Sequence, residues 1–238
     1  PRQILLGNGS DEILDLFFRS FCEPGVDNII ITPPTYGMYQ VIADINNIEV
    51  RQSFLKKDFQ LDVDNLLEQV DGKTKIVMLC SPNNPSGNNL NEQDLAHVLD
   101  SVDCLVGIDE AYIEFSESRS KVEWLSRYPN LLITQTFSKA WGMAGIRLGM
   151  GISSIVIMDI LHRVKTPYNI NTLTEKQALQ GLNDTNRHDQ NMKTLLNERA
   201  RLTQDLQEIE SVKDVFPSDA NFILIRVSDA NDIYQFLM

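Results

Sequence analysis

The sequence lacks any long apolar run: no uncharged hydrophobic stretch approaches the ~20 residues that a membrane-spanning helix needs. No signal segment of basic and then apolar residues opens it. Positive charge is also scarce, because 21 Lys and Arg residues face 33 Asp and Glu residues, giving a net charge of −12. This balance argues against nucleic acid or an anionic membrane as a partner, so any phosphate site must be local. We therefore expect a cytoplasmic protein.

Cysteine and histidine are equally scarce, with three residues of each. The cysteines lie in separate apolar segments, which is typical of small core residues in a reducing compartment rather than of disulfides. The histidines are scattered over predicted helices, where we expect solvated side chains, and no His and Cys cluster predicts a metal site. These residues are Cys22, Cys80, Cys104, His97, His162 and His188.

What the sequence does contain is an alternation of short apolar strands with amphipathic helices. A helix beginning near residue 10 places Ile13, Leu14 and Phe17 on one face, behind acidic residues in its first turn. Several strands are apolar on both faces, which predicts an α/β fold with a doubly wound, mostly parallel sheet covered on two sides. The clearest strands are expected within 28–32, 75–81, 104–112 and 131–137.

The last quarter of the chain has a different character. From about residue 171 to 210 it is polar and helical, and two strands and a helix are expected after that. The pattern predicts a large domain over 1–183, then a connecting helix with part of a smaller C-terminal α/β domain over 184–238.

Two polar motifs coincide with predicted turns. In "GNGSDE" (7–12) a glycine-bearing turn enters a helix, whose exposed N–H groups and dipole favour an anion. In "SPNNPSG" (81–87), Asn84 could donate to a ligand oxygen while Pro85 stiffens the turn. Taken alone, each motif is more often an ordinary helix cap or turn than a ligand site.

A third motif, "GIDEAY" (107–112), ends a buried strand. It places Asp109 where open α/β sheets bind ligands, and a buried carboxylate there needs a partner. A metal would need further ligands that the sequence does not supply nearby. We therefore expect an organic cation, such as a protonated ring nitrogen.

The fourth motif is "TQTFSKAWGMAGIRLGM" (134–150). Thr136, Ser138 and Arg147 can bind a phosphate, and Lys139 can form a Schiff base with an aldehyde. A lone lysine in such a loop usually has no special chemistry. Combined with Asp109, however, the motif describes a site for a molecule that carries a phosphate, an aldehyde and a pyridinium nitrogen, which is pyridoxal 5′-phosphate.

These motifs, together with "PPTYGMY" (33–39), resemble the class I and II aminotransferases of PLP fold type I, and among them the histidinol-phosphate aminotransferase branch. The resemblance covers nearly the whole chain with its motifs in order. It implies a large PLP-binding domain plus a smaller α/β domain, usually assembled as a homodimer.

The resemblance also implies residue roles. Lys139 would hold the cofactor aldehyde and then move a proton, and Asp109 would pair with the pyridinium nitrogen. Tyr112 and Asn84 would bind the 3′ oxygen, and Tyr36 would stack on the ring. The remaining residues would cradle the phosphate, with two more on the substrate side: Ser10, Asp11, Thr136, Ser138 and Arg147, then Tyr168 and Asn169.

The implied reaction is transamination of L-histidinol phosphate with 2-oxoglutarate in histidine biosynthesis. Alternatives on the same scaffold are an aromatic aminotransferase, a threonine-phosphate decarboxylase and a carbon–sulfur lyase. Outside this class, a phosphate-binding α/β protein without covalent chemistry, or an inactive structural piece, would also fit parts of the pattern.

The chain departs from the family at its ends. The family's N-terminal tyrosine segment and its C-terminal substrate-binding arginine have no counterpart between Pro1 and Met238. The chain begins without methionine and stops inside an amphipathic run. We therefore expect a fragment of a longer protein, which puts the activity of the chain as given in doubt.

Overall fold

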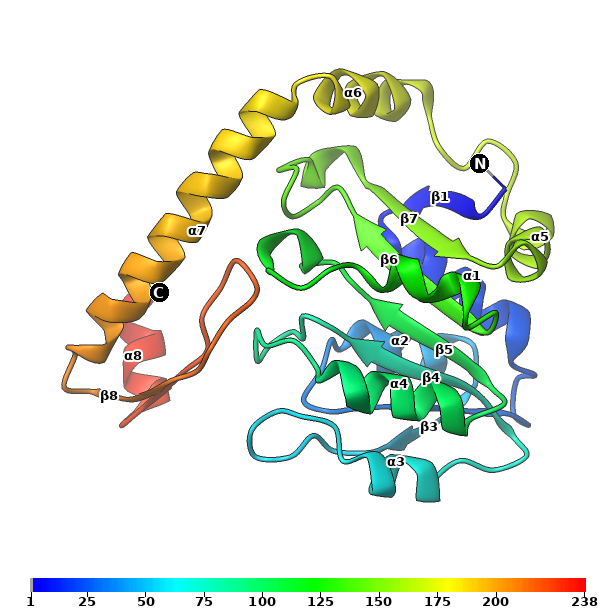
Figure 1. Cartoon of the computed structure of the whole chain (residues 1–238), viewed down its shortest axis with the longest axis horizontal. Coiled ribbons are helices and arrows are strands. Elements are labelled where there is room, and N and C mark those ends of the chain that lie inside the picture. The colour runs from blue at the N-terminus through cyan, green and yellow to red at the C-terminus, as the bar shows by residue number, and fades with distance from the viewer. Residues whose placement is uncertain (1) are drawn as a thin grey trace.

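The computed structural model describes residues 2–238, and its centre is a seven-stranded sheet with the order β1-β7-β6-β5-β4-β2-β3 (Figure 1). Strands β2 to β6 run parallel, whereas β7 is antiparallel to both of its neighbours, β6 and β1. The predicted mostly parallel sheet is therefore confirmed. The strands are β1 Ile4–Asn8, β2 Asn28–Ile31, β3 Glu49–Gln52, β4 Thr74–Cys80, β5 Leu105–Asp109, β6 Leu131–Thr136 and β7 Leu148–Ser153.

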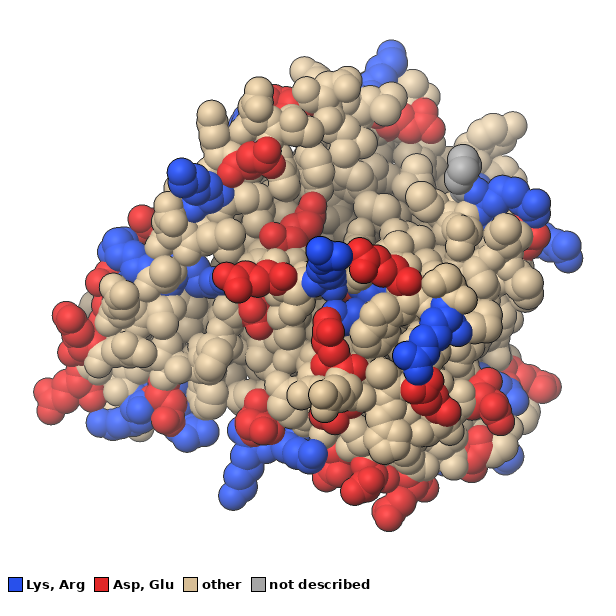
Figure 2. All heavy atoms as spheres, in the orientation of Figure 1, with Lys and Arg blue, Asp and Glu red and all other residues tan. Residues whose placement is uncertain are grey.

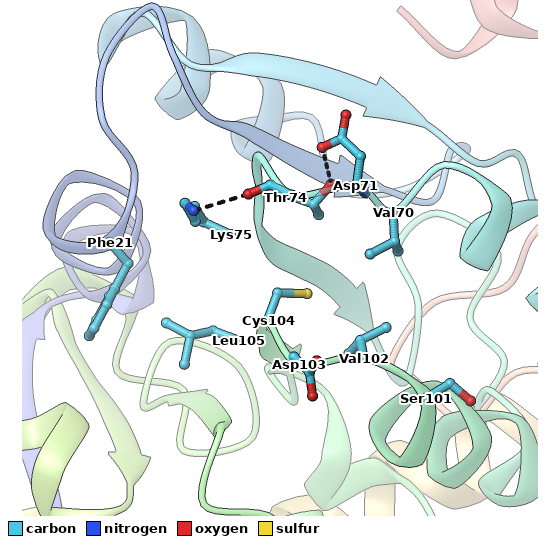
Figure 3. A pocket seen from close by; sticks show the side chains of 11 residues that line it. Phe21, Val70, Asp71, Thr74, Lys75, Ser101, Val102, Asp103, Cys104 and Leu105 are labelled. Carbon is cyan, nitrogen blue, oxygen red and sulfur yellow. Dashed lines mark hydrogen bonds between the residues drawn. The ribbon is translucent and has the colours of Figure 1, made fainter.

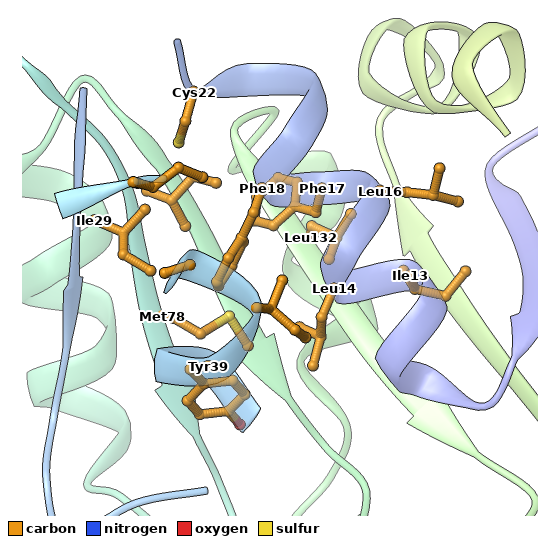
Figure 4. Close-up of a cluster of buried hydrophobic side chains, with 14 of the residues drawn as sticks. Ile13, Leu14, Leu16, Phe17, Phe18, Cys22, Ile29, Tyr39, Met78 and Leu132 are labelled. Carbon is orange, nitrogen blue, oxygen red and sulfur yellow. The ribbon is translucent and has the colours of Figure 1, made fainter. Parts of the chain in front are cut away.

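Helices cover both faces of this sheet, as the doubly apolar strands require. One face packs on α1 (Ser10–Phe21), α2 (Met38–Ile45) and α5 (Ile155–Val164), and Figure 4 shows Phe17 and Phe18 of α1 packed into this layer. The other face packs on α3 (Val63–Glu68), α4 (Glu92–Ser101) and the short helix η2 (Lys121–Ser126). Successive β4 residues alternate between the two layers, with Met78 in the first and Val77 in the second.

The segment after α5 lies apart from the sheet layers. Helices α6 (Thr172–Leu182) and α7 (Thr185–Gln207) arch past one end of the sheet (Figure 1), and the hairpin β8 (Val212–Val215) and β9 (Ile225–Val227) leads to α8 (Ala230–Leu237). The continuous helical stretch that the sequence predicted is broken, because the side chain of Asp184 caps a new helix by accepting from the Arg187 N–H.

Two further observations concern residues 2–238 only. None of their helices combines the length and the hydropathy needed to cross a bilayer. Nor do their His, Cys, Asp and Glu side chains form a group of three or more that could hold a metal ion. Acidic and basic side chains are interspersed over the face shown in Figure 2.

Candidate active site

The carboxyl ends of β4, β5 and β6 meet the start of α1, and one cavity opens between them. Every residue that the resemblance assigned to the cofactor lines this cavity, and the other lining residues are Gly9 and Ala111. Open α/β sheets bind ligands at this edge, where loops from several strands converge. The motifs, scattered over the sequence, therefore form a single site in space.

Asp109 is the buried acid of the cavity. It ends β5 with 2% of its surface exposed. Its Oδ1 accepts from the Ala111 N–H at 3.1 Å and from Thr134 Oγ1 at 3.0 Å. Burial raises the pKa of its carboxyl, and hydrogen bonds from Tyr39 and Thr134 oppose that rise. No lysine, arginine or histidine of residues 2–238 pairs with it, so the site favours a cationic ligand group.

Tyr39 is a site residue that the sequence reasoning missed. Its fully buried hydroxyl donates to Asp109 Oδ2 at 2.9 Å, and desolvation followed by the charge of Asp109 raises its pKa well above the usual value. Tyr36 lines the cavity itself and donates from its hydroxyl to Asp11 Oδ1 at 3.2 Å. The spacing of the two tyrosines in "PPTYGMY" was the available signal, since residues three apart at a helix start share a side.

The start of α1 forms a close-packed anion cradle. Gly9 has a φ of 77°, and a Cβ there would lie 2.5 Å from Arg147 Nη2. A Cβ on Gly149 would lie 2.3 Å from the Ser10 nitrogen. Only glycines therefore allow the chain segments to approach this closely. No side chain caps the helix, so its first N–H groups are available to an anion.

Polar side chains extend this cradle from β6 and β7. Arg147 Nη1 donates to Ser138 Oγ at 3.5 Å, and Thr136 Oγ1 donates to the same oxygen at 3.0 Å. Arg147 Nη2 also lies 3.8 Å from Asp11 Oδ2. A cation, two hydroxyls and a helix start thus converge, which is a donor set suited to a phosphate. One expectation was wrong in detail: Gly7 and Asn8 belong to β1 rather than to a turn.

Lys139 projects into the cavity from a tight turn closed by the Gly142 N–H and the Lys139 carbonyl. Its Nζ lies 5.2 Å from the ring centre of Tyr112, whose hydroxyl accepts from Asn84 Nδ2 at 3.3 Å. The peptide bond from Asn84 to Pro85 is cis. Within residues 2–238 Lys139 forms no ion pair, so its amine is free to meet a ligand.

The two residues suggested for the substrate side lie elsewhere. Tyr168 is 96% exposed with a φ of 57° and does not line the cavity. Asn169 Nδ2 donates to the Leu6 carbonyl at 2.9 Å and to Glu12 Oε2 at 3.2 Å, fixing its loop to β1 and α1. Their substrate role stays a prediction.

One histidine was interpreted wrongly. His97 and His162 are exposed as expected, but the side chain of His188 is only 17% exposed and stacks on Trp141. It comes from α7, and the contact is tertiary, so the helical periodicity around His188 could not reveal it.

The fold defines a class of protein, the α/β enzymes of PLP fold type I, and one cavity brings a lysine, a buried acid and an anion cradle together. The family model for aminotransferase class I and II matches residues 1–237. The chain belongs to this family and is a PLP-dependent transferase.

Named relatives agree with this assignment. The chain is 50% identical over 236 residues to a histidinol-phosphate aminotransferase of Flavobacterium johnsoniae, covering 99% of this chain and 68% of that protein. It is 52% identical over 238 residues to the one of Christiangramia forsetii, covering 100% and 68%. The solved histidinol-phosphate aminotransferase of Clostridium acetobutylicum superimposes with a TM-score of 0.90 at 32% identity, covering 99% of this chain and 71% of that one.

The residues present fit the pyridoxal phosphate that the family implies. The glycine-lined start of α1 leaves room that a Cβ would fill, and its donors suit a phosphate. Asp109 offers a buried acceptor without a cation, and Lys139 offers a free amine in the same cavity. Each functional group of the cofactor therefore has a matching side chain.

Proposed function

We propose that this protein transfers the amino group of L-histidinol phosphate to 2-oxoglutarate in histidine biosynthesis. The observation that carries the proposal is the convergence of all the assigned cofactor residues in one cavity, in a chain about half identical throughout to named histidinol-phosphate aminotransferases. We also propose that it acts as a cytoplasmic homodimer, with the domains 1–183 and 184–238. Exposed apolar side chains on α6, such as Leu173 and Leu179, support a contact there.

The side chains divide the chemistry between them. Pyridoxal phosphate supplies the electron sink when it is bound. Asp109 holds a proton on the ring nitrogen, because its carboxylate is buried beside neutral donors only. Lys139 is the residue whose amine would hold the cofactor aldehyde and would move a proton at the substrate α carbon.

The remaining residues orient the cofactor. The first N–H groups of α1 at Ser10 and Asp11 bind the phosphate, together with Thr136, Ser138 and Arg147. Tyr36 covers the ring face. Asn84 and Tyr112, already hydrogen-bonded to each other, bind the ring oxygen. Tyr168 and Asn169 are proposed for the substrate side.

The test compares three amino donors with the full protein: histidinol phosphate, phenylalanine and threonine phosphate. We expect turnover of histidinol phosphate with 2-oxoglutarate at a kcat/KM at least about 100-fold above that for phenylalanine. Threonine phosphate should give no decarboxylation product. No turnover of histidinol phosphate overturns the proposed substrate, and the two other donors then decide between the alternative reactions.

A variant pair tests the lysine. Lys139→Ala should lose the covalent cofactor adduct that borohydride reduction leaves on the wild-type chain, detected by mass spectrometry. Lys176→Ala, which removes an exposed lysine of α6, is the matched control and should keep the adduct. An adduct that persists in Lys139→Ala would falsify the assignment.

A further inference from the structure

Helix α7 presents one face to the walls of the site. Met192 and Leu196 pack with Tyr112, Phe115 and Ala140 in one apolar cluster. Arg199, three residues further along, donates from Nη1 to the Phe115 carbonyl at 3.1 Å. These positions recur at helical spacing, so a single face of α7 supports both the tyrosine and the lysine segments.

His188 lies one turn before Met192 on the same face. Its ring stacks on Trp141, with 4.2 Å between ring centres and 26° between planes. Trp141 Nε1 donates to Glu114 Oε1 at 2.7 Å, and His188 Nε2 lies 3.8 Å from the same oxygen. Trp141 follows Lys139 by two residues, and Glu114 follows Tyr112 by two in the short helix η1 (Ile113–Phe115). The cluster thus connects α7 to both segments.

The protons on these groups decide whether the cluster holds together. His188 Nδ1 lies 3.1 Å from Asp189 Oδ1, while His188 Nε2 is buried without a hydrogen-bond partner. In neutral His188 with its proton on Nδ1, the Nε2 lone pair faces the Glu114 carboxylate, which is unfavourable. A second proton turns this contact into a charge-assisted attraction.

Charged and polar groups from η1, α6 and α7 surround this contact. Burial raises the pKa of Glu114, and the Trp141 hydrogen bond and the nearby His188 lower it. His188 and Trp141 line a pocket on this side of α7. Asp184, which caps α7, and Arg187 line it too and offset each other in charge, and α6 contributes the uncharged Gln177 and Gln180. Two acidic groups, Glu114 and Asp189, therefore flank the imidazole.

We propose that Glu114, Trp141 and His188 are positioning residues that hold the Lys139 segment against α7 while a proton lies between Glu114 and His188. Loss of this proton loosens the segment and misplaces the Lys139 amine. The consequence for the Lys139 amine rests on the proposed function. The proton-dependent contact among Glu114, Trp141 and His188 does not. Imidazoles ordinarily change charge between about pH 5 and 8, so the experiments span that range.

Tryptophan fluorescence of the protein without added cofactor tests the cluster directly. The chain has two tryptophans, and an imidazolium stacked on Trp141 quenches its emission. Emission should therefore rise in one transition as the pH increases. His188→Gln should abolish the transition, and Glu114→Gln should move it to lower pH because the carboxylate that favours the imidazolium is gone.

The control is His162→Gln, which changes an exposed histidine of α5 and should leave the transition in place. Thermal unfolding of each variant shows whether it is folded. Even if a variant does not fold, the pH-dependent fluorescence transition can be measured in the unmodified protein. A flat fluorescence profile in the unmodified protein, or a transition that survives His188→Gln, overturns the proposal.

The second arm measures pyridoxal phosphate affinity against pH. At pH 6, His188→Gln should bind the cofactor about three- to tenfold more weakly than the unmodified protein, and the difference should vanish near pH 8. Equal affinities at pH 6 overturn the positioning role. Failure of the unmodified protein to bind the cofactor overturns the proposed function, and the fluorescence arm still decides the cluster.

Discussion

Two cavities lie at opposite edges of the same sheet, and they differ in what their polar groups do. The amino-edge cavity (Figure 3) has about 600 Å³, whereas the carboxyl-edge cavity has about 100 Å³. The larger one is lined by the beginnings of β4 and β5 and by the end of α1. Cavity volume alone would therefore indicate a ligand site at the amino edge, where none of the sequence motifs lies.

Polar groups of the amino-edge cavity such as Asp71, Thr74 and Lys75 are already paired. The Arg51 guanidinium holds the pKa of Asp71 well below its usual range, helped by hydrogen bonds from the Lys73 N–H and Asn28. Burial raises the pKa of the Cys104 thiol to about 11, which leaves it unreactive near neutral pH. At the carboxyl edge, Lys139 and the start of α1 are unpaired and Asp109 has no cation. We therefore expect ligand binding at the edge with the unpaired groups rather than at the edge with the larger cavity.

The largest expected effect tests the two aspartates against each other. Asp109→Asn should lower kcat for transamination at least about 100-fold, because the amide cannot hold a proton on the ring nitrogen. Asp71→Asn, at the other edge, should change kcat less than about twofold. Steady-state kinetics of both variants measure kcat. Similar losses of kcat in the two variants would contradict the claim that only the carboxyl edge takes part in catalysis.

The arginines give the next effect. Arg147→Gln should weaken pyridoxal phosphate binding about 10- to 100-fold, since it removes a charge-assisted donor from the phosphate cradle. Arg51→Gln removes an arginine beside the amino-edge cavity and should leave this affinity unchanged. Absorbance titration with the cofactor measures both. An unchanged affinity in Arg147→Gln would remove that residue from the cradle.

The residues predicted from the sequence share one property: each lies in a local motif at the end of a strand or the start of a helix. Asp109 and Lys139 could be placed this way, because parallel strands bring their carboxyl ends to one edge. Tyr39 and His188 could not, because their contacts depend on how α2 and α7 pack against distant segments. Periodicity identifies which face of a helix is apolar, but not which segment of the chain packs against that face.

Strand β1 shows the same limit for the fold. Only Leu5 in its apolar stretch is buried, together with Gly7, and its antiparallel partner β7 follows more than a hundred residues later. Its short alternation gives no clear strand signal, and Gly7 and Asn8 were predicted as part of a turn. The main parallel strands were predictable because burial on both faces leaves near-continuous apolar runs, such as the one ending at Cys80.

A smaller effect concerns Tyr39. Tyr39→Phe removes a hydrogen bond to the ionised Asp109, so the pKa of that carboxyl should rise further above its usual value. Protonation of Asp109 would then begin at higher pH, and cofactor affinity should fall about three- to tenfold on the acidic side of the profile. Binding measured across pH checks this, with Tyr234→Phe on the exposed face of α8 as the control. If cofactor affinity fell in the same way toward low pH in Tyr39→Phe and in the unmodified protein, the role of the Tyr39 hydrogen bond would be contradicted.

The smallest effect is on stability without cofactor, and it should have opposite signs at the two edges. Burial raises the pKa of Asp109, so its ionised form reduces stability at neutral pH, and this loss disappears as the pH falls and the carboxyl is protonated. Asp109→Asn should therefore raise Tm by about 2–4 °C at pH 7, with the gain shrinking toward pH 4. The pKa of Asp71 is lowered in the folded protein, so its ionised carboxylate stabilises the fold at pH values above the pKa that the group has in the unfolded chain. Asp71→Asn should therefore lower Tm slightly at pH 7 and leave it unchanged at low pH. If both variants shifted Tm in the same direction, the buried carboxylate of Asp109 would not destabilise the folded protein. The carboxyl edge would then not differ electrostatically from the paired groups of the amino edge.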